Sequence, residues 1–306
     1  MVFYFYGSNS YAINRQVDSI KQKYLQKTGD SADLLQLDLA EKGLDSLLEN
    51  IGALPMFVSS RLIIATNISL AKPTEQQLSK LIEAAPESTN LVLIDPYADK
   101  RTVVFKRLSK IKQAKEFKQL ARPQLIKWVL KEANSAGLAM GDNEAQYLVE
   151  RGGEDQWKLH NDIQKLAGYG GKITKTTIDN LVSPSLESTA FDLADALVRK
   201  DLGRVLNLYE KLLLDGQADP AILGAIIYQY RMILLNKLDS SELVKAYGAS
   251  SYSLQKARQI SSNIDLEDIR YIYQQIREAD MATKTGVLSS NEAMKQVFYR
   301  LCNRQQ

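Results

Sequence analysis

The sequence has very few of the side chains that build metal sites and nucleophilic catalytic centres. It contains one histidine, His160, and one cysteine, Cys302. A single cysteine excludes a disulfide framework within the chain and fits a reducing compartment. One histidine and one distant cysteine also exclude a zinc site of the cysteine–histidine type. No G-x-S-x-G motif accompanies His160, so we expect this residue on the solvated surface and Cys302 in an apolar core.

Long apolar runs are also missing. The longest apolar tract, residues 221–235, is interrupted by Gln229 and Arg231 and is short of the ~20 residues that span a bilayer. The amino-terminal MVFYFYGSNS has no basic region, and its apolar run stops at Gly7, so no signal peptide is predicted. We therefore expect a cytoplasmic protein with no membrane segment.

The signature of a phosphate-binding loop is absent after the first strand-like run. Such a loop needs G-x-x-x-x-G-K-[ST], because backbone N–H groups and the lysine hold the phosphates and the hydroxyl holds Mg²⁺. The matching segment from Gly7 to Asn14 has one glycine and no lysine. Residues 91–95 are similar to a strand that carries the acidic Mg²⁺ ligand, but Pro96 follows where an ATPase usually has its catalytic glutamate. We expect no catalytic residue, no cofactor and no metal.

The residues that are present predict a folded chain of two or three domains, since 45% of the 306 residues are hydrophobic and 25% are charged. In the first third, strand-like and helix-like patterns alternate, which predicts a mostly parallel sheet with helices on both faces. The strand-like runs are residues 2–6, 34–39, 62–65, 91–94 and 114–117, and the helical patterns are residues 10–27, 44–51, 74–85 and 103–111.

After residue 118 only helical patterns follow. Pro123 suits the first turn of one helix, Asp219-Pro220 is a cap and first-turn pair, and Ser289 to Glu292 reads as a capping box. The Ser183-Pro184-Ser185 sequence is typical of a linker, and about five helices are expected beyond it. The predicted fold class is α/β plus all-α, with an α/β domain over residues 1–120, a small helical domain over 121–184 and a helical bundle over 185–306.

One loop-like segment is unusually apolar. In ALPMFVSSRLIIAT, residues 53–66, the second half reads as a buried strand, whereas Leu54, Met56 and Phe57 surround Pro55 in no regular element. Apolar side chains in a loop are difficult to bury. The residues alone leave two interpretations equally open: the pair folds back onto its own domain, or it binds another protein.

Positive charge is concentrated in one stretch. Residues 100–131 contain eleven lysines and arginines against one glutamate, and so carry +10 in a chain whose net charge is +3. A stretch of this kind is either a solvated face or a surface that meets phosphates, and both interpretations remain open. The candidates for DNA or phosphate contacts are Lys100, Arg101, Lys106, Arg107 and Lys110.

Short sequence motifs follow one another along nearly the whole chain. They are Tyr6-Gly7-Ser-Asn-Ser-Tyr11, Leu54-Pro-Met-Phe57 with Arg61-Leu-Ile63, Asp99-Lys-Arg101, Phe105-Lys106, Glu116-Phe-Lys118, Gly152-Gly153, Asn161 to Leu166, Ile173-Thr174, Phe191 to Leu197 and Glu278 to Gly286. In their order and spacing, which are specific, these motifs resemble the delta-subunit family of the bacterial DNA polymerase III clamp loader.

The resemblance implies an ATPase-like (AAA+ type) domain without a working phosphate loop, a helical lid and a helical collar. The collar would join a ring with the ATPase (gamma/tau) and delta-prime subunits. The family's role is to bind the ring-shaped sliding clamp (beta) and to hold it open for loading onto primed DNA. The subunit is not an enzyme on its own within the DNA-directed DNA polymerase complex, because the partner subunits hydrolyse ATP.

The resemblance also gives the apolar loop a role. In the family a Leu-Phe pair enters an apolar pocket on the clamp, and Met56 and Phe57 stand at those positions, with Leu54 packed beneath them or in contact. Two other functions remain as alternatives. One is a divergent AAA+ ATPase, and the other is a stand-alone DNA-binding protein that uses the basic stretch.

Overall fold

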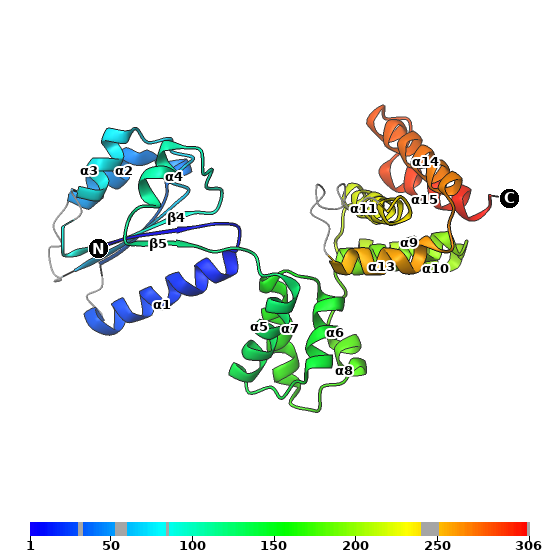
Figure 1. Ribbon diagram of the computed structural model, residues 1–306, viewed down its shortest axis with the longest axis horizontal. Helices are drawn as coiled ribbons and strands as arrows, with labels where there is room; N and C mark the ends of the chain where they lie inside the picture. The colour runs from blue at the N-terminus through cyan, green and yellow to red at the C-terminus, as the bar shows by residue number, and fades with distance from the viewer. Residues whose placement is uncertain (30–32, 53–59, 84–85, 240–250, 305–306) are drawn as a thin grey trace. The chain divides into compact units, whose positions relative to one another are not determined.

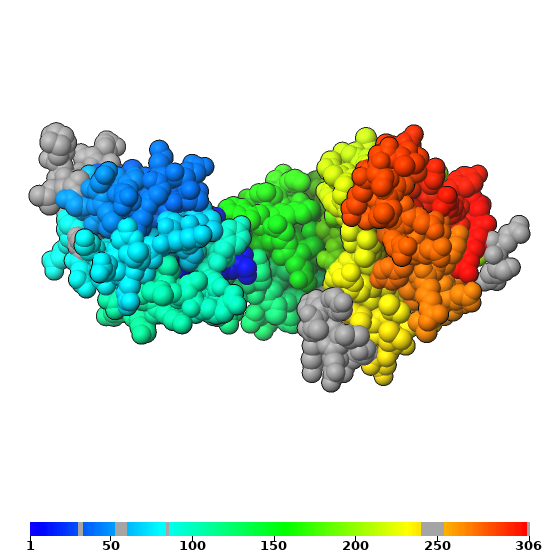
Figure 2. All heavy atoms as spheres, turned by 90° about the horizontal axis from the view of Figure 1, so that it is seen from above, coloured from blue at the N-terminus to red at the C-terminus, as the bar shows by residue number. Residues whose placement is uncertain are grey.

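The computed structural model describes residues 1–29, 33–52, 60–83, 86–239 and 251–304. The chain divides into two compact units, residues 1–125 and residues 126–306 (Figure 1). The same colour scale marks the residues of each unit in the space-filling view (Figure 2). Among the described residues, no helix is both long enough and apolar enough to cross a membrane.

The first unit is built on a parallel sheet. Its strands lie in the order β2-β3-β4-β1-β5, and every neighbouring pair is parallel. Helix α1 covers one face, and α2, α3 and α4 cover the other (Figure 1). The elements are β1 Val2–Tyr6, α1 Ser10–Thr28, β2 Asp33–Asp38, α2 Leu39–Gly52, β3 Arg61–Thr66, α3 Glu75–Glu83, β4 Thr89–Asp95, α4 Val103–Leu108 and β5 Gln113–Glu116.

The central strands are apolar because both of their faces are buried. In β3 the side chains from Leu62 to Ala65 are all buried, as expected for a parallel strand between two layers of helices. Alternate residues point to opposite faces: Tyr4 of β1 packs with α2 to α4, and Phe5 packs with α1. Helix α2 is interrupted at Gly43, whose φ is 71°. The helical pattern in the sequence is regular only after this glycine, which is why the sequence predicted the helix from residue 44 onward.

The second unit is helical throughout its described residues. Its first group consists of α5 Arg122–Ser135, whose first four residues fall before the division at residue 125, and of α6 Asp142–Gly152, α7 Gln156–Tyr169 and α8 Lys175–Leu181. Its second group is α9 Leu186–Val198, α10 Leu202–Leu214, α11 Asp219–Lys237, α13 Ser251–Ser261, α14 Leu266–Lys284 and α15 Ser290–Cys302. The second group has six described helices, whereas the sequence predicted about five. Lys200, with φ 57°, lies in the turn between α9 and α10.

The helix caps of the second group follow the sequence in one case and depart from it in another. The capping box of Ser289 and Glu292 is present, with both reciprocal hydrogen bonds. Asp219 is the first residue of α11 rather than its cap, and Ala218 takes the cap position. The Asp219 carboxylate instead accepts a hydrogen bond from the hydroxyl of Tyr209, which belongs to the core of the bundle.

The structure tests two expectations: that His160 lies on the solvated surface and that Cys302 lies in an apolar core. Cys302 is 7% exposed within the core of the bundle, as expected, and its burial raises the pKa of the thiol. The expectation for His160 holds only in part. Its side chain is 25% exposed, and its Nδ1 lies 2.8 Å from Glu132 Oε1, which joins α7 to α5. The partner lies 28 residues away in the sequence, beyond the reach of a helical pattern.

Candidate functional site

The turn that follows β1 packs directly against the backbone that leaves the sheet. Gly7 has a φ of +113°, and a Cβ atom at this position would lie 2.4 Å from the carbonyl oxygen of Phe117. No other residue type fits, because side chains avoid this conformation and the neighbouring atom belongs to the main chain. The sequence of this turn lacks a phosphate-binding pattern. The close packing of its backbone against Phe117 is a second, physical reason to expect no phosphate binding at this turn.

Polar groups of the same turn are engaged by the segment Phe117–Gln119. The Asn9 N–H donates to the Phe117 carbonyl at 3.1 Å, and the Asn9 side-chain amide donates to the Lys118 carbonyl at 3.0 Å. The Gln119 amide donates to the Ser8 carbonyl at 2.9 Å. A phosphate loop uses the N–H groups of this turn to hold phosphate oxygens. Here the chain's own segment is bound to the turn.

Asp95, at the end of β4, is also engaged within the protein. Its side chain is buried, and its carboxylate accepts hydrogen bonds from the hydroxyls of Tyr4 (3.0 Å) and Ser69. Burial, followed by the neighbouring Asp95 carboxylate, raises the pKa of Tyr4 above its usual range. Among the described residues there is no group of three or more His, Cys, Asp or Glu side chains placed to hold a metal ion.

The apolar candidates Leu54, Met56 and Phe57 lie outside the described residues, in the interval 53–59 between α2 and β3. What the structure defines is the pair of chain ends on either side of this interval. We call these ends the stem, which consists of Asn50 to Gly52 at the end of α2 and of Ser60 and Arg61 at the start of β3. Its inner side chain, Ile51, is 1% exposed and belongs to the core between the sheet and α2.

Arg61 fixes the stem by joining three elements. Its Nε lies 2.6 Å from the Asp33 carboxylate at the start of β2, and its Nη1 donates to the Asn50 carbonyl of α2 at 2.9 Å. The Arg61 side chain is only 14% exposed, so the charged pair is largely withdrawn from solvent, where the hydrogen bonds of a charged group are strongest.

Tyr24 of α1 holds the other half of the stem. Its hydroxyl donates to the Ser60 carbonyl at 2.7 Å and accepts from the Asp33 N–H at 3.0 Å. In the sequence, Arg61 stands out only as part of the family pattern, and no local pattern gives a role to Tyr24 or Asp33. The available signal was the position of an arginine at the start of an otherwise apolar strand.

The five basic candidates fall into two groups. Lys100 Nζ lies 2.9 Å from Glu116, and Arg101 Nη2 lies 2.8 Å from Asp99. Hydrogen bonds from the Arg101 side chain and backbone lower the pKa of Asp99 to about 2. The side chains of the second group are exposed and make no hydrogen bond or ion pair with any other residue that the structure describes; they are Lys106, Arg107 and Lys110.

Comparison with known proteins places these features in a family. A family model for "DNA polymerase III, delta subunit" matches residues 3–118, and a model for "DNA polymerase III delta subunit, C-terminal domain" matches residues 187–301. The chain belongs to the DNA polymerase III delta-subunit family. The resemblance that the sequence motifs indicated is therefore confirmed.

Two relatives from Bacillus subtilis extend the comparison over nearly the whole chain. The DNA polymerase III subunit delta of strain 168 is 25% identical over 316 residues, covering 93% of this chain and 88% of the relative. The solved structure of the Bacillus subtilis DNA clamp loader delta protein is 23% identical, with a TM-score of 0.66, covering 99% of this chain and 95% of that one.

The fold class expected from the sequence is confirmed by this delta-subunit likeness and by the parallel five-stranded sheet followed by helices. The chain is a clamp-loader delta subunit of DNA polymerase III, a protein of DNA replication, and its family generally forms a non-catalytic part of the polymerase holoenzyme. The division into three domains, with boundaries after residues 120 and 184, stays a prediction.

Proposed function

We propose that this delta subunit binds the sliding clamp through Leu54, Met56 and Phe57 and opens it for loading onto primed DNA. The observation that carries the proposal is the anchored stem. Arg61 and Tyr24 tie the start of β3 to β2, α1 and α2, so the chain ends that flank residues 53–59 form a fixed base. A fixed base favours binding because less conformational entropy is lost when the complex forms.

The chemistry of the pair suits an apolar pocket on a partner. Phe57 offers a rigid aromatic anchor of the kind whose truncation costs about 2 kcal/mol or more. Met56 replaces the family's leucine with an unbranched, adaptable side chain of similar length. A pocket that accepts leucine accepts methionine as well, at a small cost in side-chain ordering.

The opening step requires no ATP hydrolysis by this chain. A subunit that binds the open clamp more tightly than the closed clamp shifts the clamp toward the open state by that difference in affinity. The turn after β1, engaged by Phe117 to Gln119, supports the assignment of ATP binding and hydrolysis to the gamma/tau partner subunits, with delta-prime completing the ring.

The direct test is the double variant Met56→Ala, Phe57→Ala, with clamp affinity measured by surface plasmon resonance on the full chain. We expect a loss of roughly 30-fold or more, the equivalent of about 2 kcal/mol. Tyr97→Ala is the matched control, because Tyr97 is a 76% exposed aromatic residue of the same unit. Unchanged affinity in the double variant, with a native circular dichroism spectrum, refutes the assignment, as does an equal loss in the control.

A second proposal concerns the basic stretch: within the assembled loader, the phosphates of DNA contact Lys106, Arg107 and Lys110. It is supported by their exposure and by the lack of intramolecular partners among the described residues, whereas Lys100 and Arg101 are already paired. Replacing the first three with alanine should lower the salt slope of loader binding to primed DNA by about 3. The matched triple is Lys23→Ala, Lys27→Ala and Lys80→Ala. Equal slopes for the two triples refute the contact.

A further inference from the structure

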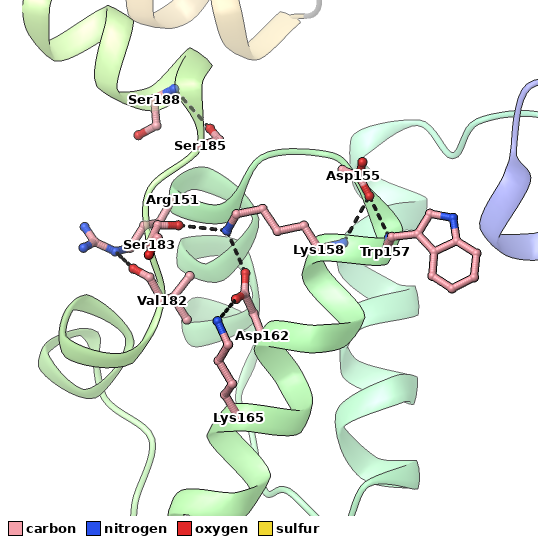
Figure 3. Close-up of polar contacts among 10 residues, drawn as sticks. All are labelled: Arg151, Asp155, Trp157, Lys158, Asp162, Lys165, Val182, Ser183, Ser185 and Ser188. Atoms are coloured by element: carbon pink, nitrogen blue, oxygen red, sulfur yellow. Dashed lines mark hydrogen bonds and ion pairs between the residues drawn. The ribbon is translucent and has the colours of Figure 1, made fainter. Parts of the chain in front are cut away.

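The linker that precedes the helical bundle is bound by an arginine of the preceding helical group. This linker, Val182–Ser185, lies between α8 and α9 (Figure 3). Arg151 Nε donates to the Val182 carbonyl at 2.7 Å, and Arg151 Nη2 donates to the Asp179 carbonyl at 3.0 Å. Its Nη1 also lies 2.8 Å from the Asp179 carboxylate. One guanidinium thus binds the end of α8 and the first carbonyl of the linker.

Lys158 of α7 binds the next carbonyl. Its Nζ donates to Ser183 O at 2.8 Å and lies 2.8 Å from Asp162 Oδ2 (Figure 3). The Asp162 side chain is 3% exposed, and a buried carboxylate is stable only when it is paired and hydrogen-bonded. The other Asp162 oxygen lies 3.4 Å from Lys165 Nζ. Asp162 therefore holds the Lys158 ammonium in line with the linker.

The Gly152-Gly153 turn provides the space for this arrangement. A Cβ on Gly152 would lie 3.2 Å from a methyl of Leu159 and 3.5 Å from Asp162 Oδ2, and a Cβ on Gly153 would lie 3.0 Å from Ser185 Cβ. Gly153 also has a φ of +84°. The paired glycines and the segment around Asp162 are sequence features of the family pattern that the clamp-binding proposal does not use.

The contact continues into the first helix of the bundle. Ser185 N–H donates to the Arg151 carbonyl at 2.7 Å. The Ser185 hydroxyl caps α9 by accepting from the Ser188 N–H at 3.1 Å (Figure 3). The Ser185 carbonyl accepts from the Thr189 N–H at 3.0 Å. Ser185, which is hydrogen-bonded to Arg151 of α6, is therefore also the N-cap of α9.

We propose that Arg151 and Lys158 form a latch, defined by their bonds to Val182 and Ser183, that makes α5 to α8 and α9 to α15 one mechanical body. A hinge requires residues that change φ and ψ freely, and the linker cannot do so without breaking these bonds. The observation that residues 126–306 form a single compact unit agrees with this inference. The latch does not depend on the proposed clamp binding, because it concerns only the residues of this unit.

The experiment measures a distance distribution within the second unit of the full chain. Spin labels are placed at Ser135→Cys in α5 and Lys211→Cys in α10, both exposed, in a Cys302→Ala background. Double electron–electron resonance should give a narrow distribution of distances between the two labels in the parent protein. In the double variant Arg151→Met, Lys158→Met, the distance distribution should broaden about twofold. Both methionines keep the apolar part of the side chain and remove the hydrogen-bond donors. Lys165→Met is the matched control, since Lys165 meets Asp162 but not the linker.

Hydrogen exchange of the full chain gives an independent measurement. The protection of the Ser185 amide should fall about tenfold in the double variant, and Lys158→Arg, which keeps a donor, should retain it. If the double variant fails to fold, Lys158→Met alone is measured in the same way. A broad distribution in the parent, or an unchanged width and protection in the folded latch variants, overturns the proposal, as does equal broadening in Lys165→Met.

Discussion

Each unit contains a glycine turn that packs against a distant part of the chain, and the two turns differ in what they contact. Gly7 meets the carbonyl oxygen of Phe117, which a Cβ would approach to 2.4 Å, whereas Gly153 meets the side chain of Ser185, which a Cβ would approach to 3.0 Å. A Cβ atom 2.4 Å from a main-chain oxygen cannot be accommodated unless the backbone moves, whereas a Cβ atom 3.0 Å from the Ser185 side chain requires a shift of only a few tenths of an ångström, although Ser185 is itself hydrogen-bonded. The contact at Gly7 therefore leaves no room for a side chain in the turn after β1, and the contact at Gly153 joins the two helical groups of the second unit.

The comparison predicts the largest effect at the first turn. Gly7→Ala should lower the free energy of unfolding of the first unit by about 3 kcal/mol or more, because it combines an unfavourable φ with an overlap against main-chain atoms. Urea unfolding followed by far-ultraviolet circular dichroism measures the change. Gly52→Ala is the control, since a Cβ there meets no atom of the described residues within 4 Å. Equal stabilities for the two variants would contradict the close contact.

A smaller effect is expected at the second turn. Gly153→Ala should cost about 1–3 kcal/mol, the usual range for a residue held in a conformation that favours glycine. The fluorescence of Trp128 and Trp157 follows this unit during unfolding, because both tryptophans lie in it. Gly168→Ala, in the same unit and with open space around its Cβ, should not be destabilising. If Gly153→Ala proved as harmless, the contact with Ser185 would carry no strain.

The smallest effect isolates backbone conformation from packing. Gly170 ends α7 in a left-handed conformation with φ 70° and ψ 2°, and no atom in the described part of the chain lies within 4 Å of its Cβ position. Gly170→Ala should therefore cost only about 1 kcal/mol, as expected for a non-glycine residue in this region. Tryptophan fluorescence during urea unfolding gives the value. A cost equal to that of Gly153→Ala would mean that φ alone, and not the contact with Ser185, sets the size of the effect.

Local patterns predicted most of the secondary structure because apolar spacing and caps act within a few residues. The run Leu62 to Ala65 is a strand, the Ser289–Glu292 capping box opens α15, and the missing phosphate pattern after β1 matches a turn engaged by its own chain. The environment of His160 was not predictable in this way, since Glu132 comes from a different helix. The candidates Leu54, Met56 and Phe57 remain a prediction from the family pattern, because they lie outside the described residues.

By itself, the sequence determined the alternation of strands and helices, the family and the position of the apolar loop. Only the tertiary structure decided what holds the turn after β1, the stem and the linker. Asn9 reaches Lys118 across 109 residues, Arg61 reaches Asn50 across 11, and Lys158 reaches Ser183 across 25. In each case the acceptor is a backbone carbonyl. Every residue carries a carbonyl, so no residue type at the partner position marks the contact, and only the folded chain brings donor and acceptor together.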